Sequence, residues 1–317
     1  MSTTRIRRLT AVILLLAALA LGVVALSACG SGDAAATTDA SPSAGPITVS
    51  DDTGATVTLD KLAQKVVSIA PADTEIAYAI GGGSKMVGGT TYDDYPEEAK
   101  SLAKVGDFSN PSVEKIVSLE PDLVLAAGGI QAGLRSKLEK LGMQVFVVDP
   151  TTYDGVMEDI TKLGQLMGLD ANAAKVVDGM TTAKEKVQAR VASLDRPATF
   201  IEVYSKPLMT AGKGTFIDDL VTLAGGSNIG AEAGAGFLNF SSEVLVKDDP
   251  AIYVAMAGSQ STPGAIAKRP GYSGLAAVKD SKVYVVEDNL IARPGPRLAQ
   301  GLEQLAAMIH PEASPAP

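Results

Sequence analysis

Two glutamates, Glu114 and Glu243, stand at the same place in two similar segments of the chain. They are 129 residues apart, and each follows a phenylalanine, Phe108 or Phe237, by six residues. Carboxylates presented at equivalent places on two similar surfaces can pair with basic groups on a partner that itself has two similar halves. The repeated segments are SVEKIVSLEPDLVLA, Ser112 to Ala126, and SSEVLVKDDPAIYVA, Ser241 to Ala255.

The repeat also indicates where a ligand would bind. One lobe built twice leaves a cleft between the two copies, and clefts are the usual sites for small molecules. The alternative interpretation of the glutamates is local, because a negative side chain near a helix N-terminus is favoured by roughly 0.3–1 kcal/mol. The repeat by itself does not choose between docking and this structural role.

Histidine and cysteine are almost absent, which excludes several chemistries. The single histidine, His310, lies in the C-terminal HPEASPAP segment, which we expect to be frayed. The single cysteine is Cys29. A metal site built on His and Cys, a Ser-His-Asp triad and a Cys-His pair therefore cannot be assembled. We expect no catalytic residue and no metal site, and a protein that is not an enzyme.

The loops carry the remaining candidates for ligand binding. Seven aromatic residues fall in or beside loops that follow strands, which is where open α/β sheets bind ligands. Several rings facing one cleft would bind a flat ligand or one with apolar edges. Arg293, before the last helix, is the candidate cationic group, whereas Arg297 in that helix's first turn requires an acidic partner. The aromatic residues are Tyr92, Tyr95, Phe108, Tyr204, Phe237, Phe240 and Tyr272.

Short apolar runs alternate with helical periodicity along most of the chain. This alternation predicts parallel sheets that are covered by helices on both faces. Strands are predicted at 47–50 and 55–59 in a hairpin, at 66–70, 86–89, 123–126 and 144–149 in the first half, and at 198–204, 251–255 and 282–286 in the second. Helices are predicted at 74–80, 112–119, 133–141, 216–224, 243–246 and 296–309.

Between the two halves, from about residue 153 to 193, there is no strand pattern. Val156, Ile160, Leu163 and Met167 recur at helical spacing, and a second helix follows through residues 171–192. The sequence therefore predicts an α/β protein of two lobes, each with a mainly parallel central sheet flanked by helices, joined by a single long interdomain helix that acts as a stiff hinge. The expected boundaries are 1–28 for a signal peptide, 29–46 for a tether, 47–150 for the N-terminal lobe, 151–195 for the linking helices and 196–317 for the C-terminal lobe.

The N-terminus has the pattern of a bacterial lipoprotein signal. Three arginines precede an apolar run from Ala11 to Leu26, and Leu26-Ser27-Ala28-Cys29 resembles the lipobox. An uncleaved membrane anchor is the alternative, because the run approaches the roughly 17 residues that span a bilayer. Residues 30–46 are small and polar, and they predict a disordered tether between a lipid at Cys29 and an extracytoplasmic body.

The charge of the chain excludes two further kinds of partner. The 27 lysines and arginines against 36 aspartates and glutamates give a net charge of −9, and loss of the signal's three arginines would leave −12. Because there is no basic run, the protein is not expected to bind nucleic acid or anionic lipid head groups. Contact with the membrane is expected through the lipid anchor only.

Taken together, these segments resemble a known family. Val66 to Ala126, VVSIAPADTEIAYAIGGGSKMVGGTTYDDYPEEAKSLAKVGDFSNPSVEKIVSLEPDLVLA, resembles the N-lobe of the ABC-importer binding proteins for vitamin B12, ferric siderophores and haem, and GKGTFIDDLVTLAGGSNI and RPGPRLAQGLEQLA resemble its C-lobe. The resemblance implies two α/β lobes joined by one long helix, a metal chelate bound in the cleft, and a permease dimer as partner. It also implies that Glu114 and Glu243 are docking positions, each facing basic residues of one permease half.

Within the family, the run from Tyr92 to Glu97 and Phe108 most resemble the cobalamin-binding branch. Phe108 and Phe237 stand where that branch commonly carries tryptophans against the corrin, and Tyr92 stands at a ring-contacting tyrosine. The chain departs from this pattern because it has no tryptophan, and Ala127 occupies another such position. The resemblance implies that Tyr92, Phe108, Tyr204, Phe237 and Arg293 contact the ligand, with a corrinoid as the first candidate.

Two other ligands and two other classes of protein remain as alternatives. A ferric siderophore bound by Arg293 and Arg135 is the second candidate ligand, and haem ligated by Tyr92 or Tyr204 is the third. A hydrolase or metal chaperone would need the missing His and Cys ligands, and a sensor lipoprotein would not need the two repeated glutamates. The expected function is therefore that of a lipid-anchored binding protein that captures a metal chelate and delivers it to an ABC importer.

Overall fold

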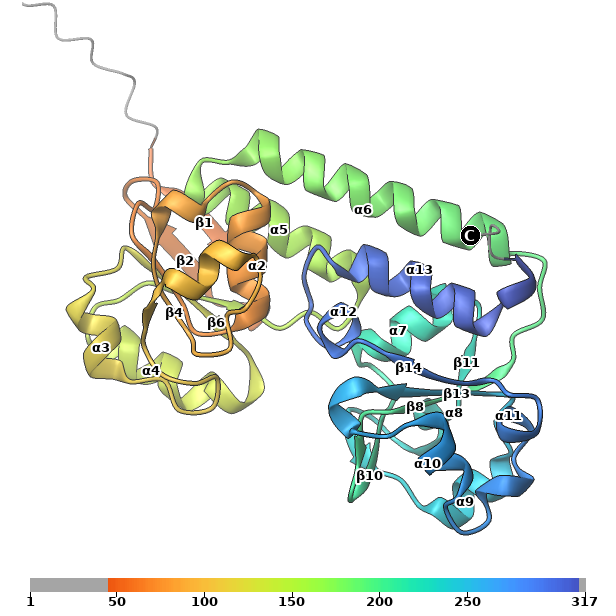
Figure 1. Ribbon diagram of the computed structural model, residues 1–317. Helices are drawn as coiled ribbons and strands as arrows, with labels where there is room; N and C mark the ends of the chain where they lie inside the picture. The colour runs from red at the N-terminus through yellow and green to blue at the C-terminus, as the bar shows by residue number, and fades with distance from the viewer. Residues whose placement is uncertain (1–44, 314–317) are drawn as a thin grey trace, which may run out of the picture. The chain divides into compact units, whose positions relative to one another are not determined.

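The computed structural model describes residues 45–313 and shows a mixed α/β protein with two separate parallel sheets (Figure 1). Residues 1–44 and 314–317 lie outside the described part, and with them the predicted signal peptide, Cys29 and nearly all of the predicted tether. Within residues 45–313, no helix is both long and apolar enough to cross a bilayer.

The first sheet contains five parallel strands in the order β5-β4-β3-β6-β7. Its central strands are fully buried apolar runs, because helices pack on both of its faces. An antiparallel hairpin precedes it, as predicted. The elements are β1 (Ile47–Ser50), β2 (Thr56–Leu59), β3 (Val66–Ser68), α2 (Pro71–Ala79), β4 (Met86–Gly89), β5 (Ala103–Lys104), α3 (Val113–Ser118), β6 (Leu123–Ala127), α4 (Ala132–Lys140) and β7 (Val145–Val148).

The second sheet contains four parallel strands in the order β11-β8-β13-β14. A small antiparallel sheet, β12-β10-β9, accompanies it and was not predicted. The elements are β8 (Ala198–Glu202), β9 (Tyr204–Ser205), β10 (Leu208–Ala211), α7 (Phe216–Leu223), β11 (Ser227–Asn228), α8 (Ile229–Ala233), β12 (Phe237–Asn239), α9 (Ser242–Asp248), β13 (Ile252–Met256), α10 (Pro263–Ala267), α11 (Ala276–Lys279), β14 (Val283–Val286), α12 (Asp288–Ile291) and α13 (Leu298–Ile309).

Two helices connect the sheets, α5 (Tyr153–Met167) and the 22-residue α6 (Asp170–Val191). The Thr152 hydroxyl caps the start of α5, and Gly168 ends it at a φ of 68°, a conformation that glycine adopts without strain. The predicted apolar face of α5 is fully buried. The helix α6, the long green helix in Figure 1, packs against both α5 and α13. The predicted α/β class with two parallel-sheet lobes is confirmed.

Two of the aromatic residues placed in or beside loops belong to the core, and one prediction about a single residue was wrong. Phe240 and Tyr272 are 7% and 1% exposed, and the ring centre of Phe240 lies 5.1 Å from that of Phe200. His310 was expected in a frayed tail. Instead it is 3% exposed and its Nε2 lies 3.2 Å from the carbonyl oxygen of Gly225, because α13 carries it onto the turn after α7.

Candidate functional site

A cavity of about 300 Å³ lies where three parallel strands of the first sheet end. Its wall follows the carboxyl ends of β3, β6 and β7 and the start of α2, which is the edge at which open α/β sheets bind ligands. Residues from α7 and from the segment before α13 complete the wall. The lining residues are Ala70, Pro71, Ala72, Asp73, Phe108, Ala127, Val148, Asp149, Phe216, Ala292, Arg293 and Pro294.

The cavity combines aromatic walls with carboxyl groups. Phe108 and Phe216 are both half-buried there. Asp73 is 1% exposed, and its Oδ2 has no hydrogen-bond partner among the described residues. Burial, and then the negative charges of Asp159, Asp93, Asp52 and Asp149, raise the pKa of Asp73 well above its usual value. Burial also raises the pKa of Asp149, with a contribution from Asp52.

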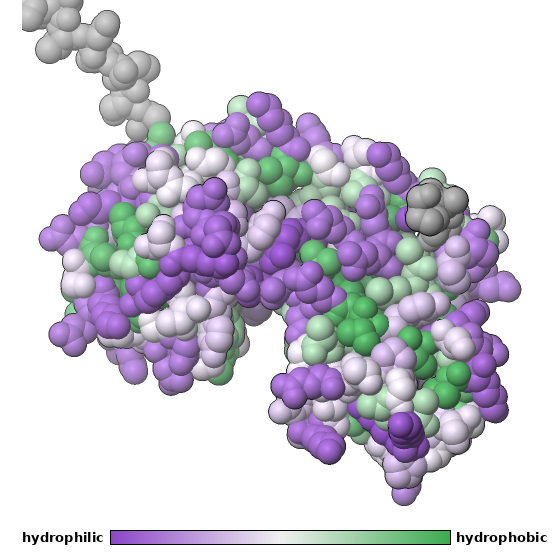
Figure 2. All heavy atoms as spheres, in the orientation of Figure 1, coloured by the Kyte–Doolittle hydropathy of each residue, from purple (hydrophilic) through white to green (hydrophobic). Residues whose placement is uncertain are grey.

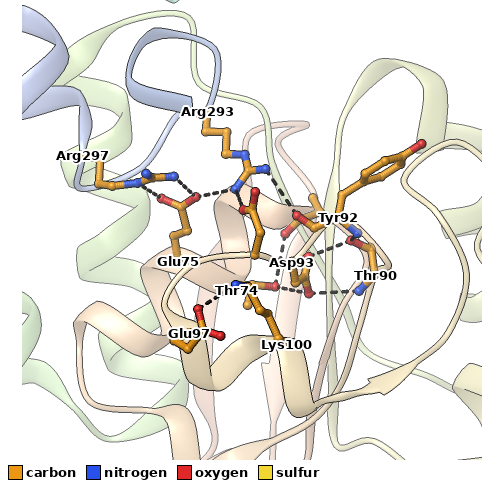
Figure 3. A network of polar contacts seen from close by, with 11 residues as sticks. Thr74, Glu75, Thr90, Tyr92, Asp93, Glu97, Lys100, Arg293 and Arg297 are labelled. Atoms are coloured by element: carbon orange, nitrogen blue, oxygen red, sulfur yellow. Dashed lines mark hydrogen bonds and ion pairs between the residues drawn. The ribbon is translucent and has the colours of Figure 1, made fainter. Parts of the chain in front are cut away.

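The one arginine in the lining is already paired. Nη1 of Arg293 lies 2.8 Å from Oε1 of Glu75 and 2.6 Å from Oδ1 of Asp94, and Nη2 donates to the carbonyl oxygen of Tyr92 at 3.3 Å. Figure 3 shows Arg293 and Arg297 reaching Glu75 from the same C-terminal segment, while the ring of Tyr92 points away from them. Two carboxylates therefore neutralise the guanidinium that faces the cavity.

Arg297 has the acidic partner that its position requires. Its Nε and Nη2 donate to Oε2 and Oε1 of Glu75 at 2.7 and 2.6 Å, a bidentate pair. The guanidinium also lies 4.2 Å from the centre of the Tyr95 ring. The predicted salt bridge of Arg297 is confirmed, and Glu75, whose side chain is 2% exposed, serves both arginines at once.

A buried aspartate holds the loop that carries Asp94. Asp93 is 2% exposed and accepts hydrogen bonds from the Thr90 hydroxyl at 2.7 Å, the Thr90 amide at 2.9 Å and the Thr74 hydroxyl at 2.9 Å. Gly89 leaves the space that this carboxylate occupies, because a Cβ there would collide with it. The loop is thus fixed in the position from which Asp94 and the Tyr92 carbonyl face Arg293.

A larger hollow of about 640 Å³ also borders Glu75 and Arg297. It is lined mainly by one side of α2 and the turn that follows, together with Tyr95, Pro96 and Glu98. This hollow does not lie at strand ends, so we assign the ligand site to the smaller cavity.

The two repeated glutamates occupy equivalent places in the fold. Each is the second residue of a short helix, α3 or α9, whose preceding serine caps it: Ser112 accepts from an amide at 3.3 Å and Ser241 at 3.2 Å. Both glutamates are exposed, and neither takes part in an ion pair within residues 45–313. The strands that follow, β6 and β13, hold equivalent central positions in their sheets.

Residues 66–290 match the sequence profile of the family described as periplasmic binding protein. This match covers well over half of the chain. The chain belongs to the periplasmic binding protein family. Its relatives are substrate-binding proteins of ABC transporters rather than enzymes, so the prediction of a non-enzymatic binding protein is confirmed, and the family acts outside the cytoplasm.

Three relatives illustrate the range of the family. This binding protein is 36% identical over 275 residues to the "uncharacterized ABC transporter substrate-binding lipoprotein YvrC" of Bacillus subtilis (strain 168), covering 84% of this chain and 86% of YvrC. It is 34% identical over 200 residues to the vitamin B12-binding protein of Yersinia pestis (strain Pestoides F), covering 63% and 71%. The crystal structure of a possible iron-binding (periplasmic solute-binding) protein from Staphylococcus epidermidis ATCC 12228 has a TM-score of 0.69 at 30% identity, covering 79% of this chain and 100% of that one.

Of the five ligand residues expected from the sequence, the structure brings Phe108 and Arg293 into the cavity lining. Tyr92, Tyr204 and Phe237 are 57%, 48% and 51% exposed and are not among the lining residues. Phe237, which was expected in a loop, belongs to the short strand β12, and Tyr204, predicted at the end of a strand, begins the separate short strand β9.

Arg135, the second arginine considered for a siderophore, forms ion pairs outside the cavity. Its Nη1 lies 2.9 Å from Asp51 and its Nε 2.7 Å from Glu139, and it does not line the cavity. This ion pair joins α4 to the turn of the β1–β2 hairpin.

Sequence reasoning missed Asp73, Asp149 and Phe216 as lining residues. A signal existed for the two aspartates, because Asp149 directly follows β7 and Asp73 lies in the first turn of the helix after β3. Both positions are at the ligand-binding edge of a parallel sheet. Phe216 begins α7 directly after its capping residue Thr215, and no feature of the sequence assigns that helix start to the cavity.

Proposed function

We propose that this binding protein captures a corrinoid in the 300 Å³ cavity and delivers it to an ABC importer. The observation that carries the proposal is that the described lining offers no unpaired cation: its one arginine is paired with Glu75 and Asp94, and its other ionisable groups are the carboxyl groups of Asp73 and Asp149. Such a wall favours a ligand without net negative charge. Corrinoids are flat and bear amide side chains, which can donate to Asp149 and Asp73 while the ring packs on Phe108 and Phe216.

The cavity is too small for a whole macrocycle and would have to widen to bind one. A volume of 300 Å³ is at the lower end of ligand pockets. A corrin therefore requires the wall segment that carries Arg293 to move away from the first sheet. The contacts of Arg293 with Glu75, Asp94 and the Tyr92 carbonyl are the ones that such an opening would break.

Haem is the weakest of the three ligands. None of the described lining residues is Tyr, His, Met or Cys, the side chains that usually ligate haem iron. The haem propionates would also lie close to Asp149. Tyr92 and Tyr204 remain exposed outside the lining.

A ferric siderophore is the alternative, and one observation favours it. Arg293 lines the cavity and would keep only Glu75 as a carboxylate partner if it left Asp94, so an anionic chelate could compete with Asp94 for the guanidinium. The likeness to the possible iron-binding protein of Staphylococcus epidermidis supports the same reading. The likeness to the vitamin B12-binding protein of Yersinia pestis supports the corrinoid.

The proposal includes the anchor and the partner. A lipid at Cys29 and the tether to residue 46 would hold the protein at the outer face of the cell membrane, as the lipoprotein name of YvrC suggests. Glu114 and Glu243 would dock the two lobes on the two halves of a permease dimer, supported by their exposure and equivalent placement.

Calorimetry with two probes tests the ligand. Cyanocobalamin should bind the purified mature protein with a dissociation constant below about 100 µM, a generous ceiling for a capture protein. A polyanionic ferric catecholate should bind far more weakly, because Arg293 is already paired. Binding of the catecholate in preference to cyanocobalamin would transfer the assignment to the siderophore alternative.

A further inference from the structure

The two short helices α3 and α9 share more than their glutamates. Val117 and Val246 follow Glu114 and Glu243 by three residues, and they are 39% and 38% exposed. Residues three apart on a helix lie on one face. Each helix therefore presents a carboxylate and, about one helical turn further along, a partly exposed valine. Single exposed apolar residues are ordinary on protein surfaces. On the face shown in Figure 2, hydrophobic residues are interspersed with hydrophilic ones. The same residue, equally exposed, at the same place in two lobes is not ordinary.

Buried residues on the opposite side of each helix hold the glutamate and the valine in place. Ile116 and Leu245, which precede the two valines, are completely buried and hold the helices against their sheets. The chain then leaves each helix through a residue with a left-handed backbone, Glu120 at φ 49° or Asp249 at φ 43°. A proline and a central strand follow in both lobes. The glutamate and valine are therefore carried by one rigid unit that the fold contains twice.

A third exposed valine, Val244, has no counterpart in the other lobe. Val244 of α9 is 42% exposed, but Lys115 stands at the equivalent place in α3. Val244 directly follows Glu243, so it points in a different direction from Val246. Only the position one turn beyond the glutamate keeps an exposed valine in both lobes.

We infer that Val117 and Val246 are the apolar contact points of the two docking surfaces. The partner is the ABC importer of the proposed function, on which this assignment rests. Each half of that importer would then offer a cation to the glutamate and, about one helical turn away, an apolar hollow to the valine. The glutamates contribute attraction at a distance that salt screens, whereas the valines contribute contact that salt does not weaken.

Binding to native membranes tests the assignment. The full-length mature chain carrying Cys29→Ser, which has no lipid of its own, is titrated onto membrane vesicles from the native host lacking its own copy of the protein. Saturable binding that unlabelled protein displaces is measured at low and high salt. Three variants are compared: Val117→Ser with Val246→Ser, the matched control Val244→Ser, and Glu114→Gln with Glu243→Gln.

We expect the double valine variant to bind about tenfold more weakly, because it loses two buried apolar contacts. Its binding should also fall more steeply with salt, since only the charges remain. Val244→Ser should bind as the parent does, and urea unfolding should be unchanged in all three variants because the altered side chains are exposed.

The outcomes separate this assignment from the docking role itself. If the double glutamate variant binds weakly and the double valine variant binds normally, the valines are not contact points and docking stands. If Val244→Ser weakens binding as much as the valine pair does, the effect is not specific to the repeated position and the assignment fails. If both double variants bind normally, the docking role of α3 and α9 falls as well.

Discussion

Arg297 and Glu75 form a bidentate ion pair although 222 positions separate them in the sequence. Glu75 lies on α2, directly after the first strand of the first sheet, and Arg297 immediately precedes α13 near the C-terminus. Arg293 shares the same carboxylate. The buried Glu75 therefore links α2 of the first sheet to the segment that precedes α13, and this segment also lines the cavity.

Glu75→Gln should lower the free energy of unfolding by about 3 kcal/mol, because both guanidinium groups lose the charge of a carboxylate that is 2% exposed. Urea unfolding at neutral pH measures the change. The matched control is Glu97→Gln, which removes an ion pair with Lys100 at a side chain that is 81% exposed and should change the free energy by less than about 1 kcal/mol. Equal effects of the two substitutions would show that burial of Glu75 does not matter.

Phe108→Ala should weaken cyanocobalamin binding by about 1–3 kcal/mol, since it removes an aromatic face from the cavity wall. Phe237→Ala is the matched control, because Phe237 stands at the repeated position but is 51% exposed on β12. Calorimetry compares the two variants. A larger loss from Phe237→Ala would place the ligand against β12 and not inside the cavity.

The free energy of unfolding should fall as the pH rises from about 4 to 8. Burial and the charge of Asp52 raise the pKa of Asp159 to about 8, whereas an aspartate in the unfolded chain titrates near 3.9. Between these values the folded protein holds a proton that the unfolded chain has released, so raising the pH favours unfolding. Asp159→Asn should make this dependence shallower and should stabilise the protein at pH 8 relative to pH 5.

The control for Asp159 lies on the same helix. Asp154→Asn removes a carboxylate that is 62% exposed and pairs with Lys184, so it shows what the loss of one negative charge from this helix does by itself. Urea titrations at four pH values between 4 and 8 measure all three proteins. An equal pH dependence of the wild type and Asp159→Asn would contradict the raised pKa of Asp159.

Gly128→Ala should weaken ligand binding by displacing Asp149. A Cβ at residue 128 would lie 2.7 Å from the Cβ of Asp149 and still closer to its carboxylate, so the aspartate would have to leave its place in the cavity wall. Gly133→Ala on α4 is the control, because the added methyl group meets nothing within 4 Å and alanine favours the helix by up to about 1 kcal/mol. Normal cyanocobalamin affinity in Gly128→Ala would show that Asp149 does not contact the ligand.

Cys29→Ser should move the mature protein from the membrane fraction to the soluble fraction without changing its ligand affinity, because the proposed lipid site lies 17 or more residues before the first strand and outside the cavity lining. Fractionation followed by calorimetry checks both parts. A variant that stays wholly in the membrane fraction would indicate an uncleaved apolar anchor.

The sequence predicted the longer parallel strands to within a few residues, because runs such as Leu123–Ala127 and Val145–Val148 are apolar on both faces. The two-residue parallel strands β5 and β11 were missed. The two-residue β9 and three-residue β12 could not be predicted, since so few residues show no periodicity. Phe237 was expected in a loop for this reason. Its place on β12 depends on pairing with Ala211 of β10, a partner that nothing near it in the sequence indicates.

The candidate site was predicted only in part, and the missing part concerns partners that are distant in the chain. The loop position of Arg293 indicated a cation at the cavity, but nothing local revealed that Glu75 and Asp94 neutralise it from 218 and 199 positions away. The unpaired oxygen of Asp73 likewise depends on the packing around α2. Composition and spacing identify the groups that can act, whereas the charge that a ligand meets is set by long-range contacts.

The position of α13 has a consequence for the order in which this protein matures. The helix packs on α6 and α7, and the arginines just before it pair with Glu75, so contacts of α2 are completed by residues more than 200 positions later in the chain. A partly synthesised chain lacks these contacts, so its core stays incomplete until α13 is available. Deletion of α13 should therefore leave a loosely packed protein that proteases degrade.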